Sequence, residues 1–170
     1  CPIFLQFGSP NPTSVQQFGF SVALAKDFVV VGAPGDDMMA TENGMAYIFK
    51  LENSGGKLKV ELDASFMPMG LTAYSRYGHS VAIYYGSDDV NVPENSLSER
   101  VAIGAPGLNE TGMVFVYVRL DEEDGWDLLG EVWAPPTTNA EDFGRAVSWY
   151  NDYMVRHLKH TCIRILTLQE

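Results

Sequence analysis

The sequence repeats one ordered set of short motifs, and this repetition limits the possible folds more than any other feature. An aromatic residue followed by glycine occurs three times, 59 and 66 residues apart, at Phe18-Gly19, Tyr77-Gly78 and Phe143-Gly144. The first two are each followed by "GAP", at 32–34 and 104–106, and then by a glycine that leads a hydrophobic run, at Gly44 and Gly112. Features that recur in one order indicate a repeat architecture whose units stack on their neighbours.

β-Branched and aromatic residues dominate the runs between these motifs, as is typical of strands. In the first repeat we predict strands over Phe20–Ala25, Phe28–Val31, Met45–Leu51 and Leu58–Phe66. The second repeat predicts strands over His79–Tyr85, Arg100–Ile103, Met113–Leu120 and Trp126–Trp133, and a third begins with Gly144–Trp149 and Tyr153–Val155. The sequence therefore predicts an all-β fold, a β-propeller fragment of about two complete four-stranded antiparallel blades with partial blades at each end.

The repeat boundaries divide the chain into five parts. Residues 1–17 are interpreted as the outer strand of a preceding blade and a link, 18–76 and 77–142 as the complete blades, and 143–155 as the start of a third repeat. Residues 156–170 form a divergent tail, rich in basic residues and histidine, where another GAP strand would be expected. One hypothesis is that a frameshift or intron read-through produced this tail, and the alternative is a divergent final strand.

The two complete blades would leave faces uncovered, because a single four-stranded blade cannot bury both of its faces. The chain also begins with Cys1 and not with Met. We therefore expect a fragment of a longer protein, or a fragment that associates with itself to close the propeller.

The composition excludes several classes of function. The net charge is −11, which argues against binding to nucleic acid and to anionic membrane surfaces. No apolar run approaches the ~20 residues that span a bilayer, so no membrane insertion is expected in this segment. The two cysteines, Cys1 and Cys162, have no spacing typical of zinc sites or disulfide frameworks.

The motifs "FGFSVA…VVVGAP…GMAYIF" and "YGHSVA…VAIGAP…GMVFVYV" resemble the FG-GAP repeat family, which forms the propeller at the head of integrin α subunits. The resemblance extends from about Ile3 to Val155. It implies a non-enzymatic, extracellular or cell-surface module for binding or adhesion, with a protein or glycan ligand held by the blade loops. Alternatives are an accessory propeller of a larger secreted hydrolase, as in a phospholipase D, or a non-functional fragment. In such repeats the aromatic residue can fill space between blades, and the glycines can allow close backbone approach.

The resemblance also implies a possible calcium loop between the aromatic-glycine strand and the GAP strand. In the first repeat only "AKD" lies there, too short to surround an ion. The second repeat has "GSDDVNVPENSLSE", in which Asp88, Asp89, Asn91 and Glu94 offer the oxygen ligands that Ca²⁺ prefers. The loop departs from the family pattern, because Pro93 takes an alternate position and the glycine is absent. An irregular calcium site and a solvated acidic loop are both open, and we expect no other cofactor.

Three further motifs carry possible chemistry. His79-Ser80 could suggest a base and a nucleophile, but neighbouring residues of a strand point to opposite faces, so no catalytic residue is assigned. Asp36 and Asp37 in "GAPGDD" are expected in an exposed turn. Asn109-Glu110-Thr111 is an N-glycosylation sequon with Asn109 as the acceptor. Ligand-binding residues are expected on the loops Gly86–Glu99 and Gly35–Asn43, because binding residues often lie on loops that a rigid scaffold positions.

Overall fold

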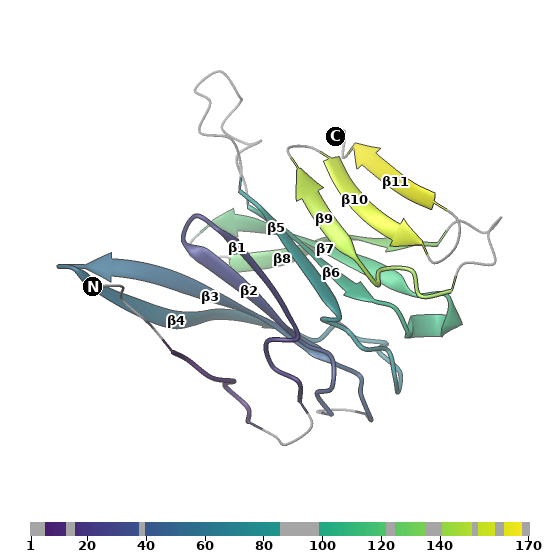
Figure 1. The fold of residues 1–170 in the computed structure, drawn as a ribbon, viewed down its shortest axis with the longest axis horizontal. Coiled ribbons are helices and arrows are strands. Elements are labelled where there is room, and N and C mark those ends of the chain that lie inside the picture. The colour runs from purple at the N-terminus through teal and green to yellow at the C-terminus, as the bar shows by residue number, and fades with distance from the viewer. Residues whose placement is uncertain are drawn as a thin grey trace.

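The computed structural model describes residues 6–12, 16–37, 40–85, 99–121, 125–134, 141–150, 153–158 and 162–167. These residues form three antiparallel sheets whose strands follow one another in chain order (Figure 1). Sheet 1 contains β1 (Ser21–Ala25), β2 (Phe28–Ala33), β3 (Met45–Ser54) and β4 (Lys57–Phe66). Sheet 2 contains β5 (Ser80–Tyr84), β6 (Arg100–Ala105), β7 (Met113–Asp121) and β8 (Gly125–Trp133), and sheet 3 contains β9 (Val147–Tyr150), β10 (Tyr153–Leu158) and β11 (Cys162–Thr167).

The prediction of an all-β fold with two four-stranded antiparallel sheets is confirmed. The helix in the described ranges is a single short 3-10 turn, η2 (Leu108–Glu110). Most strands lie within a few residues of the predicted bounds, but β2 and β6 continue through the Gly-Ala of each GAP. They do so because these small residues still pair, Gly32 with Ala46 and Ala33 with Met45 in sheet 1. The three described sheets form an open arc (Figure 1).

The backbone of the predicted tail takes part in sheet 3. β10 continues beyond Val155 to Leu158, and β11 pairs along it from Cys162 to Thr167. Arg156 lies opposite Val147 of β9. Residues 156–158 and 162–167 therefore have strand backbone, while the origin of this segment stays a prediction.

The sheets stack face to face, with their first strands β1, β5 and β9 side by side (Figure 1). One apolar cluster lies between sheets 1 and 2 and includes Val30, Ile48, Val101 and Phe115. A second lies between sheets 2 and 3 and includes Ala102, Val114, Val116 and Phe143. Burial of these apolar faces, at about 25 cal/mol per Å² removed from water, is what holds one sheet on the next.

The aromatic-glycine steps join consecutive sheets. Tyr77 and Phe143 are fully buried, and each forms a parallel bridge with the leading glycine of the preceding repeat, Gly44 and Gly112. Gly78 has a φ of +84°, and a Cβ there would overlap the carbonyl oxygen of Met45. The prediction that the aromatic fills space between units and the glycine permits close approach is thus confirmed at the second and third repeats.

The GAP glycines complete the same contact from the other side. A Cβ at Gly32 would lie well inside 3.0 Å of the Gly78 carbonyl oxygen, and a Cβ at Gly104 would meet the Gly144 carbonyl oxygen in the same way. Both glycines have ordinary strand backbone, because neither is among the residues with positive φ. Their role is therefore to remove a side chain at the point where two backbones touch.

Candidate functional site

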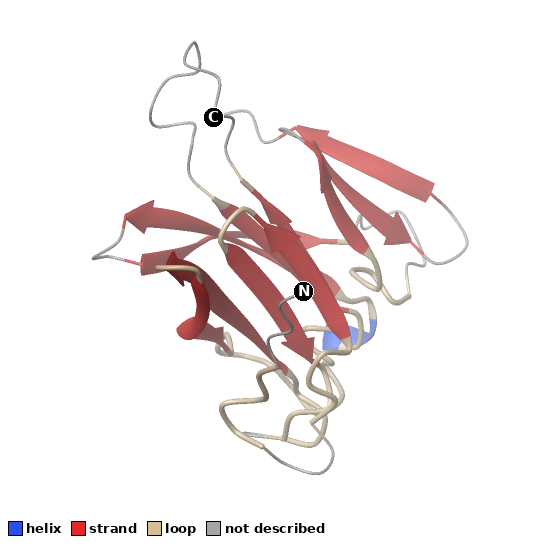
Figure 2. Ribbon diagram, turned by 60° about the vertical axis from the view of Figure 1, so that its left-hand side comes forward, coloured by secondary structure: helices blue, strands red, loops and turns tan. Residues whose placement is uncertain are grey.

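The candidate site is a group of loops at one end of sheets 1 and 2 (Figure 2). The GAP strands lead into these loops, and the chain between β4 and β5 passes beside them. We call the described residues 35–37, 40–43, 72–76 and 107–111 the loop platform. Three backbone hydrogen bonds join its parts: the amides of Tyr74 and Arg76 donate to Thr41 and Glu42, and that of Gly107 donates to Ser75, at 2.8–3.1 Å. A fourth runs from the amide of Tyr77, just beyond the platform, to the Asn43 carbonyl at 3.0 Å. The loops of two sheets are thereby held as one surface.

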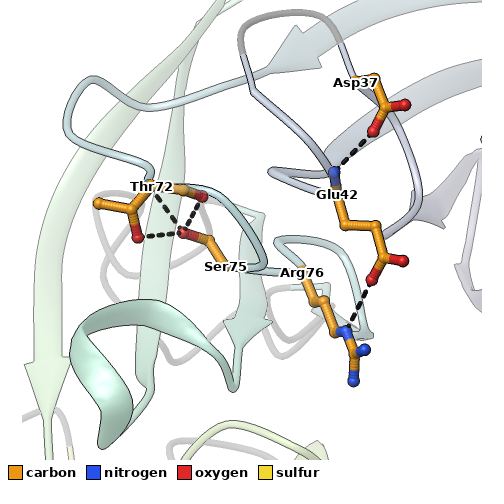
Figure 3. A network of polar contacts seen from close by, with 5 residues as sticks. All are labelled: Asp37, Glu42, Thr72, Ser75 and Arg76. Atoms are coloured by element: carbon orange, nitrogen blue, oxygen red, sulfur yellow. Dashed lines mark hydrogen bonds and ion pairs between the residues drawn. The ribbon is translucent and has the colours of Figure 1, made fainter.

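Side chains reinforce the platform (Figure 3). The Asp37 carboxylate accepts from the backbone N–H of Glu42 at 2.6 Å, and Arg76 Nε donates to Glu42 Oε2 at 3.0 Å. The Ser75 hydroxyl donates to the Thr72 carbonyl at 2.7 Å and accepts from the Thr72 N–H at 2.8 Å. The ion pair is solvent-exposed, so we assign it about 0–1 kcal/mol. Its main effect is to position the Arg76 and Glu42 side chains.

The expectation that both aspartates of "GAPGDD" lie in an exposed turn is wrong for Asp36. Asp36 is buried, although Asp37 is exposed. Gln16 Nε2 donates to Asp36 Oδ2 at 2.7 Å, and the Tyr47 hydroxyl also donates to it, at 3.3 Å. These donors compensate the loss of hydration of the carboxylate. Burial, and then the Asp36 charge, raise the pKa of Tyr47 above its usual value.

The platform includes residues that the sequence did not indicate. Tyr74 and Arg76 lie in the connection before the second aromatic-glycine step, and both have left-handed backbone, with φ of 63° and 53°. Gln17 and Asp142 hold the place of Arg76 before the other two steps, with φ of 54° and 59°. A polar residue immediately before each step is the signal that identifies this position. Because the strain recurs in all three repeats, we attribute it to the architecture and not to one ligand.

The four proposed calcium ligands, Asp88, Asp89, Asn91 and Glu94, lie outside the described residues. The strands on either side show where their loop connects: Tyr84 pairs with Arg100, whereas Ala105 pairs with Met113 beside the platform. The loop therefore joins sheet 2 at the end away from the platform. Among the residues that the structure describes, no group of three or more His, Cys, Asp or Glu side chains is arranged to hold a metal ion.

The sequon lies at the edge of the platform. Asn109, Glu110 and Thr111 are exposed, in and just after η2. Leu108 beside them is buried and fixes the turn to the core between sheets 1 and 2. The acceptor side chain is thus presented to solvent on a short, anchored turn.

Within the described ranges, no helix has the length and apolar character needed to cross a membrane.

His79 and Ser80 contact the next repeat and not each other. The Ser80 hydroxyl donates to the Gly144 carbonyl at 2.7 Å, and His79 Nδ1 lies 3.2 Å from the Arg145 carbonyl. Ser21 repeats the first contact one sheet earlier, donating to the Gly78 carbonyl at 2.8 Å. The serine of each "SVA" segment is therefore a donor between sheets.

The position of His79 predicts a pH dependence of stability. Its pKa is lowered mainly by partial burial, which outweighs the opposing hydrogen bond to the Arg145 carbonyl. The cations of Arg145 and Arg76 lower the pKa further, and the Asp142 charge raises it. The folded state binds this proton less tightly than the unfolded chain. The contribution of His79 is therefore complete above its ordinary pKa of 6.5 and is lost as pH falls from that value through the lowered pKa of the folded state.

We expect His79→Phe, which copies Phe20 of the first repeat, to lose less stability than the parent on going from about pH 7.5 to about pH 5.5. Urea unfolding of both proteins at the two pH values measures this difference. Carboxylates titrate in the same range in both proteins, so the comparison cancels their contribution. Parallel pH profiles would show that His79 does not contribute.

Residues 11–49 match the model of the FG-GAP repeat. This range begins in the segment before Phe18 and ends in β3, so it includes the first aromatic-glycine step, the first GAP and Gly44. The resemblance identified from the motifs is thus confirmed for the first repeat. No curated protein matches the chain.

Proposed function

We propose that this FG-GAP repeat chain is a segment of a β-propeller that acts as a non-enzymatic binding or adhesion module, outside the cell or at its surface. The FG-GAP match over residues 11–49 supports the propeller, as do four-stranded sheets that stack with their first strands side by side. The partner that we propose is a protein or a glycan. The fold alone does not determine what a protein binds. The proposal of a binding function therefore rests on the exposed residues of the loop platform.

The observation that carries the proposal is that the platform is rigidly supported and yet exposed. Its loops are joined by backbone hydrogen bonds across two sheets, while the Tyr74, Arg76 and Asp37 side chains are exposed to solvent. Tyrosine and arginine are enriched among residues that dominate binding energy at interfaces. Support from the sheets keeps the entropic cost of ordering the loop backbone low on binding.

The test is a binding screen of the intact chain against arrays of purified glycans and secreted proteins. For any ligand found, we expect Tyr74→Ala to weaken binding at least about tenfold, as for a central interface residue. Lys57→Ala is the matched control, because Lys57 is exposed at the β3–β4 turn, away from the platform. Ligands that bind Tyr74→Ala as tightly as the parent, or an empty screen with folded protein, would contradict the proposed function.

The proposed location predicts modification of Asn109. When the chain is expressed behind a secretion signal in eukaryotic cells, we expect one endoglycosidase-sensitive species of lower electrophoretic mobility, because the exposed sequon is accessible. Asn109→Gln should remove this species, whereas Thr111→Ser, which keeps the sequon, should retain it. Secretion of the parent chain without any such species would show that the turn is not an acceptor.

A further inference from the structure

The loop platform contains the one Asn-Gly pair in the sequence, Asn43-Gly44. Asparagine followed by glycine is the dipeptide most prone to succinimide formation. Glycine has no side chain, so its backbone nitrogen can readily attack the side-chain carbonyl of the asparagine before it. The pair is therefore chemically labile wherever the chain around it can move.

The contact between sheets 1 and 2 requires the glycine of this pair. Gly44 has a φ of +84°, and a Cβ there would overlap the backbone nitrogen and carbonyl oxygen of Tyr77. Gly112 has the same φ and meets Phe143 in the same way, but the residue before it is Thr111. The architecture thus fixes the glycine and not the asparagine, and the second repeat forms the same contact without a labile pair.

The folded structure holds both reacting groups in hydrogen bonds. Asn43 is fully buried. Its side-chain amide, oriented to satisfy its neighbours, donates to the carbonyl oxygens of Ala40 and Asp36, each at 2.8 Å. The Gly44 amide donates to the same Asp36 carbonyl at 3.0 Å. The attacking nitrogen and the leaving amide are therefore bound to one acceptor, and ring closure requires these bonds to break.

We propose that Asn43 is a deamidation site that the loop platform protects, and that its conversion weakens the contact between sheets 1 and 2. When the loop opens, the Gly44 nitrogen bonds to the side-chain carbonyl carbon of Asn43 and loses its proton, and ammonia leaves. Water then opens the resulting succinimide at either carbonyl, which gives aspartate or isoaspartate. The reaction consumes a water molecule and releases ammonia, and no oxidation or reduction takes place.

Either product places a negative charge where the folded chain has a buried, neutral amide. In the aspartate form, a carboxylate faces the carbonyl oxygens of Ala40 and Asp36, which can only accept hydrogen bonds, so the charge has lost its hydration without gaining these groups as donors. In the isoaspartate form, the chain from residue 43 to Gly44 is one carbon longer. Gly44 then no longer fits against Tyr77, whose N–H donates to the Asn43 carbonyl at 3.0 Å.

The test measures deamidation at this site in the intact chain at neutral pH. The tryptic peptide 27–50 contains Asn43 and no other asparagine or glutamine, so a gain of about one mass unit reports this residue, and chromatography separates aspartate from isoaspartate. We expect the folded chain to react at least about tenfold more slowly than the chain unfolded in urea, because the reaction waits for local opening. Asn43→Thr, which copies Thr111, should leave the peptide unchanged.

Asp37→Ala tests whether the platform provides the protection, because the Asp37 carboxylate accepts from the N–H of Glu42, the residue before Asn43. This variant should deamidate at least about threefold faster than the folded parent, since the loop opens more often. Lys57→Ala, at the exposed β3–β4 turn away from the platform, is the control and should react at the rate of the parent.

The deamidated chain is then isolated and compared with the parent by amide exchange. We expect the Tyr77 amide to exchange at least about tenfold faster, while the amides of β7 stay protected. Equal deamidation rates in the folded and unfolded chains, or a deamidated chain that protects Tyr77 as well as the parent does, would overturn the proposal. So would an unchanged rate in Asp37→Ala, or an unfolded chain that does not react. The inference does not rest on ligand binding, so the ligand screen can fail without affecting any of these results.

Discussion

Replacing Gly104 by alanine is expected to reduce the free energy of unfolding by about 3 kcal/mol, the upper part of the range for overpacked interiors. A Cβ at Gly104 would overlap the backbone carbonyl oxygen of Gly144 and the Ser80 hydroxyl oxygen. A side chain can rotate away from such an overlap, but a backbone carbonyl moves only if sheet 3 moves with it. Denaturant unfolding should show a lower midpoint with little change in the m-value.

Gly130→Ala is the matched control for Gly104→Ala. Gly130 also lies in a strand of sheet 2 and has no positive φ, and a Cβ at this position would meet nothing within 4 Å. Alanine there should change stability by no more than about 0.5 kcal/mol, or raise it slightly through the unfolded state. Equal effects at the two glycines would mean that the backbones of sheets 2 and 3 do not touch at Gly104.

The strands were predictable because local and repeated signals agreed. Apolar and β-branched runs mark most strands in both repeats, and each run appears twice in the same order, so an error in one copy is corrected by the other. The C-terminal ends of β2 and β6 were harder to predict from the sequence. Gly32 and Gly104 interrupt the apolar pattern, and only their pairing with β3 and β7 shows that the strands continue.

The contacts between sheets were only partly predictable. The sequence indicated that the aromatic-glycine steps and GAP serve the architecture, but it did not indicate that Ser21 and Ser80 donate to the next repeat. The alignment of the repeats held a signal at this position, because the first two repeats have serine and the third has Ala146. Asp36 shows the opposite case: its burial depends on Gln16, 20 residues earlier, and on Tyr47. Sheet 2 has Leu108 at the corresponding position, so no repetition exists to reveal it.

The loop platform was predicted in part. The sequence predicted Gly35–Asn43 as a binding loop. It did not indicate the segment 72–76, because the composition of this segment is not unusual. The segment is important because its backbone forms hydrogen bonds with two other loops. Such bonds form between segments about 30 residues apart and leave no local pattern in side chains. The predicted binding loop of the second repeat, Gly86–Glu99, has several acidic residues. The strands on either side of it, β5 and β6, meet it at the end of sheet 2 that lies away from the platform. Topology, and not composition, separates the two loops.

Tyr77→Ala is expected to have the second large effect, a loss of about 3–5 kcal/mol in the free energy of unfolding. Tyr77 is fully buried, packs edge-on against Phe115 with ring centroids 5.3 Å apart, and donates its hydroxyl to the Tyr117 hydroxyl at 3.0 Å. Burial raises its pKa well above the usual value, so it is held as the neutral phenol. Removing the ring leaves a cavity where sheets 1 and 2 meet.

Two variants separate the sources of this effect. Tyr77→Phe removes only the hydroxyl bond and should cost about 1 kcal/mol. Phe18→Ala removes the corresponding ring of the first repeat, which packs on Tyr47 and Phe49 but is only partly buried, because none of the three described sheets lies before it. We expect this loss to be clearly smaller than that of Tyr77→Ala, since burial between two sheets is what makes the ring important. If Phe18→Ala were as costly as Tyr77→Ala in urea unfolding, each ring would act within its own sheet, and the aromatic-glycine step would not be the element that binds one repeat to the next.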